Sequence, residues 1–194
     1  MGIALFDFDG TLIEGDSCFL FHRKVFGLPK VLSAALKASI LHGLSQDRRH
    51  RMKQAFLSDL WAGVSRDELR THCEDFVSDL DRAMRPGAQD RLSWHLGRGD
   101  QVALVSASVS DWLEPWCRSH GVESLIATEL EDIGGVLTGR IKGRNCRGPE
   151  KVRRIKRAFP SLPEPVFVYG DSEGDREMFT LAERSRRFYR PFRR

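Results

Sequence analysis

Short apolar runs and helical patterns alternate along much of the chain. The first run covers residues 3–8 and ends in acidic residues followed by Gly10. A short, continuous apolar run of this kind is typical of a buried strand in a parallel sheet. Similar runs predict further strands at 101–105, 124–129 and 165–169. Helices are predicted beside these strands at 88–97, 109–120, 150–159 and 173–182. This order of elements predicts an α/β protein with a parallel sheet flanked by helices.

The stretch from residue 16 to residue 83 lacks strand-like runs and has the character of a helical block. Asp16-Ser17 is suited to cap a first helix, and residues 31–44 form a second, strongly apolar one. A third helix is expected to open at 45–47, and a capping box at 65–68 starts a fourth. The block therefore predicts a helical insertion after the first strand.

Domain boundaries follow from this change of pattern. Arg85-Pro86-Gly87 is a breaker signal at the end of the helical block. We therefore expect a core of residues 1–15 and 84–194 and a helical cap of residues 16–83. Within the core, Gly134-Gly135 lies between two short strand-like runs and predicts a hairpin.

Composition and charge narrow the class of protein only a little. Hydrophobic residues make up 41% and charged residues 30% of the 194 residues, which excludes wholesale disorder and fibrous architectures. The net charge of +4 is compatible with nucleic acid, anionic membranes or phosphorylated metabolites. Several arginines gather near the C terminus: Arg184, Arg186, Arg187, Arg190, Arg193 and Arg194. They indicate either a polyanion-binding tail or, more simply, a solvated C terminus.

The cysteines and the N terminus predict the setting of the protein. The cysteines lie far apart, at Cys18, Cys73, Cys117 and Cys146, without a C-x-x-C pair. A zinc site is therefore not expected. No secretory signal and no apolar stretch of membrane-spanning length are visible. We expect a cytoplasmic protein with reduced thiols.

Polar residues follow the predicted strands where a doubly wound sheet binds its ligands, beyond the carboxyl ends of the strands. The residues at this rim are Asp7, Asp9, Ser106, Lys151, Asp171 and Asp175. Acids this close together repel one another when ionised, and a divalent cation would relieve the repulsion. Because the donors are all oxygen atoms, Mg²⁺ is the expected ion. Magnesium, a lysine and a hydroxyl together predict a phosphate site.

Two of these acids suggest a reaction. Asp7 is placed to act as a nucleophile on phosphorus, as carboxylates do in enzymes that form an aspartyl phosphate. Asp9, two residues further on, is placed to reach the leaving oxygen as a general acid.

The same residues resemble the motifs of a known family. Asp7-Phe8-Asp9-Gly10-Thr11 resembles the first motif of the haloacid dehalogenase superfamily, and Ser106 and Lys151 resemble the second and third. Residues 170–175, Gly-Asp-Ser-Glu-Gly-Asp, resemble the fourth. All four occur in the family's order across nearly the whole chain. The helical insertion directly after the first motif resembles the phosphoserine phosphatase-like branch.

The resemblance implies a Rossmann-like core with a small helical cap over the site, and a role for each motif residue. Asp7 would form the phosphoaspartyl intermediate, and Asp9 would protonate the leaving alkoxide and then deprotonate water. The implied Mg²⁺ ligands are Asp7, the backbone carbonyl of Asp9, and Asp171. The implied phosphate-binding residues are Thr11, Ser106 and Lys151. Asp175 would orient Lys151 or a metal-bound water.

The sequence departs from the family pattern at two places. Gly174 stands where many relatives have asparagine, and Arg147 lies near the third motif, where it competes with Lys151 for the phosphate role. In the cap, Asp16 and Lys53 fall where phosphoserine phosphatases read the amino and carboxylate groups of their substrate. The simpler interpretation makes Asp16 a helix N-cap and Lys53 part of a solvated face. A lysine lacks the two-pronged fork that suits a carboxylate, which argues against phosphoserine itself.

The expected function is magnesium-dependent hydrolysis of a phosphomonoester through an aspartyl phosphate. The expected substrate is a small phosphorylated metabolite, phosphoserine-like or other. The apolar helix at 31–44 packs within the cap or contacts lipid, and the second alternative would make the protein a lipid-phosphate phosphatase. Phosphoryl transfer to another acceptor, and a non-enzymatic polyanion-binding module, are the remaining alternatives. A nucleic-acid partner is not expected, and the oligomeric state is left open.

Overall fold

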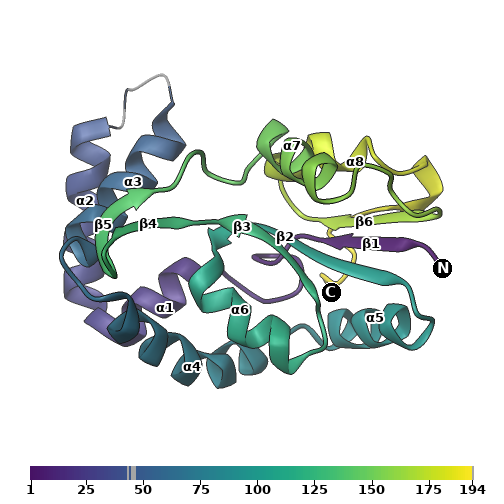
Figure 1. Ribbon diagram of the computed structural model, residues 1–194, viewed down its shortest axis with the longest axis horizontal. Coiled ribbons are helices and arrows are strands. Elements are labelled where there is room, and N and C mark those ends of the chain that lie inside the picture. Colours follow the sequence, from purple (N-terminus) through teal and green to yellow (C-terminus); the bar gives the residue numbers. More distant parts are fainter. Residues whose placement is uncertain (43, 45–46, 194) are drawn as a thin grey trace.

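A five-stranded parallel sheet forms the centre of the structure, a computed structural model that describes residues 1–42, 44 and 47–193 (Figure 1). Across the sheet the strands are β3 (Ser124–Thr128), β2 (Gln101–Val109), β1 (Ile3–Phe6), β6 (Val166–Gly170) and β7 (Arg187–Tyr189). Every pairing within it is parallel. The carboxyl ends of β1, β2 and β6 therefore meet at one edge, as the sequence predicted.

Both faces of this sheet are buried, which explains the continuous apolar runs. Along β1, Ile3 and Leu5 belong to one hydrophobic cluster and Ala4 and Phe6 to the other. Successive side chains of a strand point to opposite faces, so a strand covered on both sides requires an apolar residue at every position.

Helices cover the two faces in separate layers (Figure 1). One layer contains α5 (Pro86–Gly97) and α6 (Ser110–Ser119), and the other contains α7 (Pro149–Ala158) and α8 (Arg176–Phe179). The structure confirms the predicted α/β class with a doubly wound parallel sheet. No helix in the described ranges has the length and hydropathy needed to cross a bilayer.

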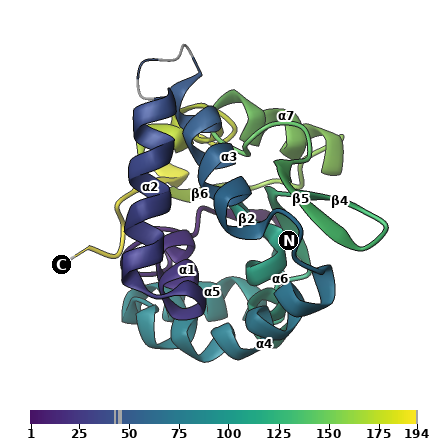
Figure 2. The same cartoon turned by 90° about the vertical axis from the view of Figure 1, so that its left-hand side faces the viewer.

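Four helices lie between β1 and α5, and we call residues 17–83 the helical insert (Figure 2). They are α1 (Ser17–Phe26), α2 (Leu28–His42), α3 (Arg48–Trp61) and α4 (Arg66–Ala83). Two predicted caps are present: the side chains of Asp16 and Ser65 accept hydrogen bonds from the N–H groups of Phe19 and Glu68. These bonds satisfy N–H groups that the first turn of a helix leaves unpaired.

The second helix differs from its prediction at both ends. It begins at Leu28 rather than at 31, because Pro29 can occupy the first turn, where its missing N–H is not needed. It ends at His42, so Leu44 is not part of it. Of the residues expected to open the third helix, Ser45 and Gln46 lie outside the described residues. The helix itself begins at Arg48.

Aromatic side chains fill the interior of the insert. The rings of Phe21 and Trp112, which belongs to α6, stack at 5.0 Å between centroids, so the insert shares its core with the sheet layer. His22 is fully buried, and its Nε2 accepts a hydrogen bond of 2.8 Å from Trp61 Nε1. Its Nδ1 must then carry the proton that is donated to the Cys18 carbonyl at 2.6 Å.

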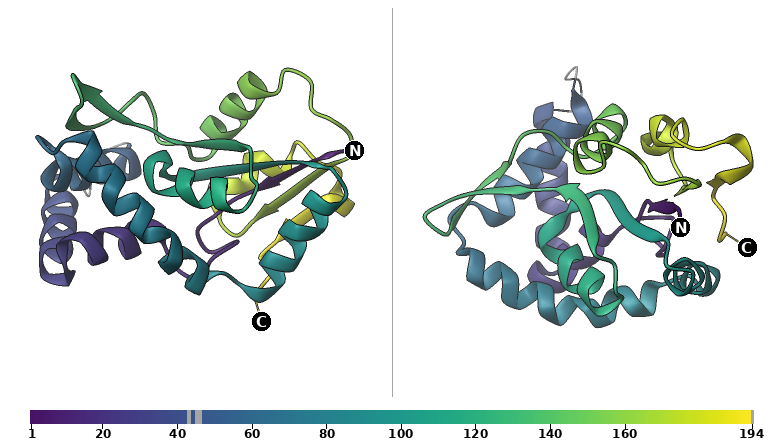
Figure 3. Two further views of the ribbon diagram at one scale, coloured as in Figure 1. Left: turned by 60° about the horizontal axis from the view of Figure 1, so that its bottom comes forward. Right: turned by 45° about the vertical axis from the view of Figure 1, so that its right-hand side comes forward.

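The predicted hairpin around Gly134-Gly135 is present, formed by β4 (Leu130–Ile133) and β5 (Val136–Ile141). It leaves the main sheet and lies against the insert (Figure 3). The N–H of Gly63 donates to the carbonyl of Leu137, and the N–H of Leu137 donates to the carbonyl of Val64, each at 2.9 Å. Nothing in the sequence predicted this attachment, because it joins residues that are far apart in the chain.

Three expectations about the second half of the chain need correction. The second strand continues from residue 105 to Val109. The helix expected over 173–182 is a 3₁₀ turn at Glu173–Asp175 followed by the short α8. The C-terminal segment was predicted without a strand, but Arg187–Tyr189 pairs with β6 as β7, while Arg184, Arg187, Arg190 and Arg193 are exposed as the solvated interpretation expected. Phe188 anchors that strand by stacking on Tyr169 at 4.6 Å between centroids.

His22 gives a prediction about pH and stability. Burial lowers its pKa from 6.5 to about 4. Below pH 6.5 the unfolded chain binds a proton that the folded chain does not, so the free energy of unfolding falls as the pH drops towards 4. The expected loss from this group between pH 7 and pH 5 is about 2 kcal/mol. The measurement is urea unfolding of the parent and of His22→Gln at pH 7 and at pH 5. Between these pH values the free energy of unfolding should fall by about 2 kcal/mol less in the variant than in the parent.

His72→Gln is the matched control, since it removes a histidine from α4 whose ring is only partly buried. Equal pH dependence in the parent and in His22→Gln would contradict the assignment of His22 as a buried neutral histidine.

Candidate functional site

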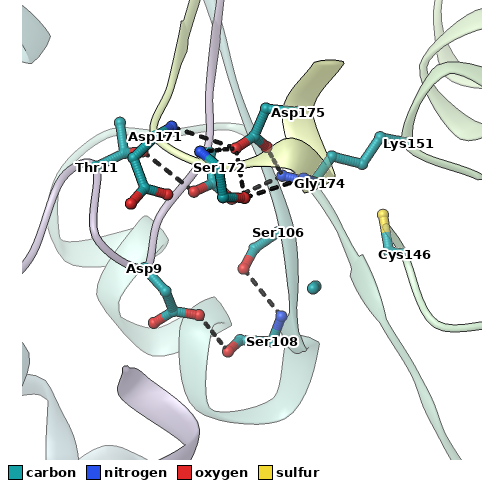
Figure 4. Close-up of polar contacts among 12 residues, drawn as sticks. Asp9, Thr11, Ser106, Ser108, Cys146, Lys151, Asp171, Ser172, Gly174 and Asp175 are labelled. Atoms are coloured by element: carbon teal, nitrogen blue, oxygen red, sulfur yellow. Dashed lines mark hydrogen bonds and ion pairs between the residues drawn. The ribbon is translucent and has the colours of Figure 1, made fainter. Parts of the chain in front are cut away.

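The residues that the sequence placed at one rim do meet at the carboxyl ends of β1, β2 and β6 (Figure 4). Asp7 directly follows β1, and Ser106 lies on β2. Asp171 directly follows β6, and Lys151 lies in the first turn of α7, reaching the rim from the side. Parallel strands bring these residues together although the chain separates them widely.

A buried ion triad forms the centre of the site. Lys151 Nζ lies 2.6 Å from Asp7 Oδ1 and 2.6 Å from Asp175 Oδ1, and only 1% of the Lys151 side chain is exposed. Burial raises the pKa of Asp7 to about 7, against the attraction of Lys151 and with added repulsion from Asp175. Burial alone would lower the pKa of Lys151, but the two carboxylates raise it, so the lysine stays charged.

Asp175 holds the turn after β6 as well as the lysine. Its Oδ2 accepts hydrogen bonds from the N–H groups of Asp171 at 3.2 Å and Ser172 at 3.1 Å, and from the Ser172 hydroxyl at 3.1 Å. Because both carboxylate oxygens are engaged in this way, Asp175 orients Lys151 toward Asp7.

Three carboxylates offer a site that suits a divalent cation. Oxygen atoms of Asp7, Asp171 and Asp175 all lie within 4.8 Å of one another, and all three residues are buried. Burial raises the pKa of Asp171, with Arg193 opposing this and the neighbouring charge of Asp175 adding to it. Carboxylate oxygens are hard donors, so the residues fit Mg²⁺.

The Asp9 carboxylate points away from this cluster. Its Oδ1 accepts a hydrogen bond of 2.6 Å from the N–H of Ser17, and its Oδ2 one of 2.6 Å from the Ser108 hydroxyl (Figure 4). Burial, with a contribution from Asp16, raises its pKa to about 6. The side chain thus lies on the side of the helical insert and is suited to carry a proton near neutral pH.

Two hydroxyls flank Asp7 and Asp9. The buried Thr11 donates to Asp7 Oδ2 at 3.1 Å. Ser106 is also buried, and its Oγ accepts from the N–H of Ser108 at 3.0 Å. The rim therefore contains both hydroxyls and the lysine that the resemblance assigned to phosphate binding.

The two departures from the family pattern are linked in space. A Cβ on Gly174 would lie 2.9 Å from Arg147 Nη1 and 3.1 Å from Arg147 Cζ. Glycine at this position therefore leaves the space that the arginine side chain fills. Arg147 does not replace Lys151, since Lys151 is the cation in contact with Asp7.

The two candidate residues of the insert differ in their surroundings. Asp16 is exposed and caps α1, as its simpler interpretation stated. Lys53 is half-buried, and its Nζ donates to the carbonyl of Ala107, beside Ser106 and Ser108. The solvated-face interpretation of Lys53 is therefore wrong, because its ammonium group lies at the carboxyl end of β2.

Several residues at the site were missed by sequence reasoning. Ser108 and Ser17 hold Asp9, and the Ser17 hydroxyl donates to Ser108 Oγ at 2.9 Å. The signal for Ser108 is its two-residue spacing from Ser106, which places both on one face of a strand. Arg193, whose Nη2 donates to Asp171 Oδ2, gave no signal because its approach depends on β7.

Comparison with known proteins agrees with this geometry. A family model for haloacid dehalogenase-like hydrolases matches residues 4–180. The protein CicA of Caulobacter vibrioides is 31% identical over 98% of this chain and 86% of its own length. A phosphoserine phosphatase of Archaeoglobus fulgidus is 27% identical over 93% of this chain and 50% of its own length. A crystal structure of a Bordetella pertussis protein of unknown function superposes with a TM-score of 0.74 at 30% identity, covering 92% of this chain and 86% of that one.

Gly10 gives a prediction about how the site is packed. Its φ is +73°, and a Cβ there would lie 2.5 Å from Asp171 Oδ2. Gly15, with φ of +87° and no atom within 4 Å of its Cβ position, is the matched control. Both alanine variants should lose about 1–2 kcal/mol through left-handed backbone strain. Only Gly10→Ala should lose roughly 1–3 kcal/mol more by displacing Asp171. Urea unfolding measures the difference, and equal losses would contradict the tight packing of Gly10 on Asp171.

Proposed function

We propose that the protein catalyses magnesium-dependent hydrolysis of a phosphomonoester through an aspartyl phosphate. The chain belongs to the haloacid dehalogenase-like hydrolases and to their phosphoserine phosphatase-like branch. The chain is accordingly an enzyme of the phosphatase type. The observation that carries the proposal is the buried triad in which Lys151 bridges Asp7 and Asp175 at the rim of the sheet.

Asp7 is the nucleophile in this proposal. One of its carboxylate oxygens attacks phosphorus, and the new O–P bond forms as the bond from phosphorus to the leaving oxygen breaks. Asp9 gives its proton to that leaving oxygen, which its position on the insert side of the rim supports. In the second step Asp9 takes a proton from water, the water oxygen attacks phosphorus, and the bond to Asp7 breaks.

Cationic and polar groups act on the phosphoryl oxygens. Lys151, Thr11 and Ser106 bind these oxygens and keep the group in line with Asp7. Asp7, Asp171 and the backbone carbonyl of Asp9 would hold Mg²⁺, which would supply positive charge to offset the charge of the phosphoryl group. Asp175 keeps Lys151 in position, as its hydrogen bonds indicate.

The substrate class proposed first is a small phosphorylated metabolite. Lys53 and Asp16 are the insert residues proposed to read its leaving group, and the contact of Lys53 with the Ala107 carbonyl supports a place at the site. Phosphoserine is one member of the class, and transfer to an acceptor other than water has no specific support in the structure. A cytoplasmic setting with reduced thiols stays a prediction.

A lipid phosphate is the second candidate substrate, because the outer face of α2 is apolar and exposed. Large aliphatic residues recur along that face, at Leu28, Leu32, Leu36, Ile40 and Leu41. Leu36 is 62% and Ile40 is 74% exposed. Residues four apart share one face of a helix, so this stripe could lie on the surface of a bilayer. A substrate screen that contains both phosphoserine and a vesicle-borne phosphomonoester separates the two classes.

Asp7→Asn should abolish turnover and leave the protein folded but less stable, since the change keeps the shape and removes the nucleophile together with one charge of the triad. The measurement is phosphate release together with circular dichroism, with Asp90→Asn on the exposed surface of α5 as control. Acid-quenched parent enzyme should carry phosphate that hydroxylamine removes, and the variant should carry none. Substantial magnesium-dependent phosphatase activity in Asp7→Asn would rule out the proposed nucleophile.

Removal of the metal should also stop the reaction. Dialysis against EDTA is expected to abolish phosphate release, and MgCl₂ is expected to restore it. CaCl₂ should support the reaction poorly, because Ca²⁺ accepts longer bonds and more ligands than Mg²⁺. Full activity in excess chelator would show that Asp7 and Asp171 do not act through a metal.

A further inference from the structure

A basic cavity of about 720 Å³ lies between the start of α3 and the segment that joins β5 to α7. This segment runs from the side of the insert to the core (Figure 1). Its lining has basic residues from both sides: Arg48, Arg49 and His50 from α3, and Arg144, Arg147 and Arg153 from beyond β5. Two acids, Asp47 and Glu150, also line it. The cavity is therefore shared by the helical insert and the core.

Several of these arginines are not neutralised, including Arg49 from one side of the cavity and Arg147 from the other. Arg153 is paired with Glu150, but no carboxylate in the described ranges lies within ion-pair distance of Arg49 or Arg147. Burial, followed by the nearby charge of Arg49, lowers the pKa of Arg147. The charges of three acids oppose this lowering of the pKa only in part: Asp175, Glu173 and Asp7. Two guanidinium groups that repel each other across a cavity are stabilised by an anion, which each can bind in a two-pronged manner.

Arg147 links this cavity to the proposed catalytic site. Its side chain lies along Gly174, with Cγ 3.2 Å from the place a Cβ would take, and the N–H of Gly148 donates to the carbonyl of Gly174 at 2.9 Å. Gly174 precedes Asp175, which holds Lys151 on Asp7. Arg147 therefore lines the cavity and also packs against the turn that carries Asp175.

We propose that Arg147 and Arg49 form an anion subsite, and that the substrate is a phosphomonoester whose leaving group carries a second anionic group, a carboxylate or a phosphate. The inference rests on the proposed hydrolysis at Asp7. Lys151 does not fill this role, because it lies between Asp7 and Asp175, where the proposed function assigns it to the transferred phosphoryl group. The subsite is also separate from Lys53, whose ammonium group is bonded to Ala107.

Matched pairs of substrates test this. Propyl phosphate is compared with propane-1,3-diyl bisphosphate, and ethyl phosphate with phosphoglycolate, all in MgCl₂. The parent should prefer the compound with the second anion in at least one pair by roughly tenfold to a hundredfold in kcat/KM, mainly through KM. The pair that shows the preference distinguishes a phosphate from a carboxylate.

Arg147→Gln and Arg49→Gln should each bring that ratio close to one, and Arg147→Lys should restore only part of it because lysine lacks the fork. Arg51→Gln is the matched control, since Arg51 is an exposed arginine of α3 that lines a different cavity. A ratio near one in the parent, or a ratio unchanged in both glutamine variants, overturns the subsite.

Failure of the subsite and failure of the proposed function give different results. Asp7-dependent hydrolysis without preference for a second anion removes the subsite and leaves the proposed function in place. If the parent hydrolyses none of the four compounds, calorimetric titration of the same compounds into the same variants decides. Tighter binding of the doubly anionic compounds that is lost in Arg147→Gln supports the subsite, and equal binding overturns it.

Discussion

The buried ion triad of Lys151, Asp7 and Asp175 is the interaction around which the site is arranged. Its members come from the first turn of α7, the end of β1 and the turn after β6, so it joins three segments that are distant in the chain. Breaking such a pair by removing one partner typically costs about 3–5 kcal/mol, because a buried charge is left without compensation. Since the triad and Asp171 together carry excess negative charge, the same interaction creates the demand for a divalent cation.

The helical insert is fixed to this site from several directions. Its aromatic interior continues into the core through the stack of Phe21 on Trp112. Ser17, the first residue of α1, donates its N–H to Asp9, and Lys53 of α3 reaches the Ala107 carbonyl. Contacts between the insert and the core thus hold both Asp9, which is proposed to transfer a proton, and Lys53, which is proposed to bind the leaving group.

The sequence predicted those parts of the fold that depend on residues close together in the chain. Runs such as Ile3–Phe6 are apolar at every position because both faces of the sheet are covered, and the carboxyl ends of such strands bring Asp7 and Asp171 together. The start of α2 was missed because Pro29 acts as a breaker within a helix but is accommodated in its first turn. Strand β7 was hidden by its arginines, since its place depends on Phe188 stacking on Tyr169.

The candidate site shows the same division between local and distant signals. Its acids and Lys151 belong to motifs, whereas Ser17 and Arg193 take part through contacts between segments that are not neighbours in the chain. No spacing in the sequence reports such contacts. Gly174 and Arg147 fall between these two cases. The sequence shows each as a departure from the family pattern, but only the structure shows that they are in contact and therefore occur together.

The attachment of the β4–β5 hairpin to the insert has a mechanical consequence. The backbone passes between the insert and the sheet near Asp16 and Met84, where the N–H of Glu14 donates to the Ala83 carbonyl. The hairpin forms a second crossing, closed at its root by the bond from the N–H of Lys142 to the Glu129 carbonyl. A body tethered at one point can swing and twist, but tethered at two it keeps only rotation about the line that joins them. Side-chain contacts between the insert and the core, such as the stack of Phe21 on Trp112, oppose the one rotation that the two crossings leave open.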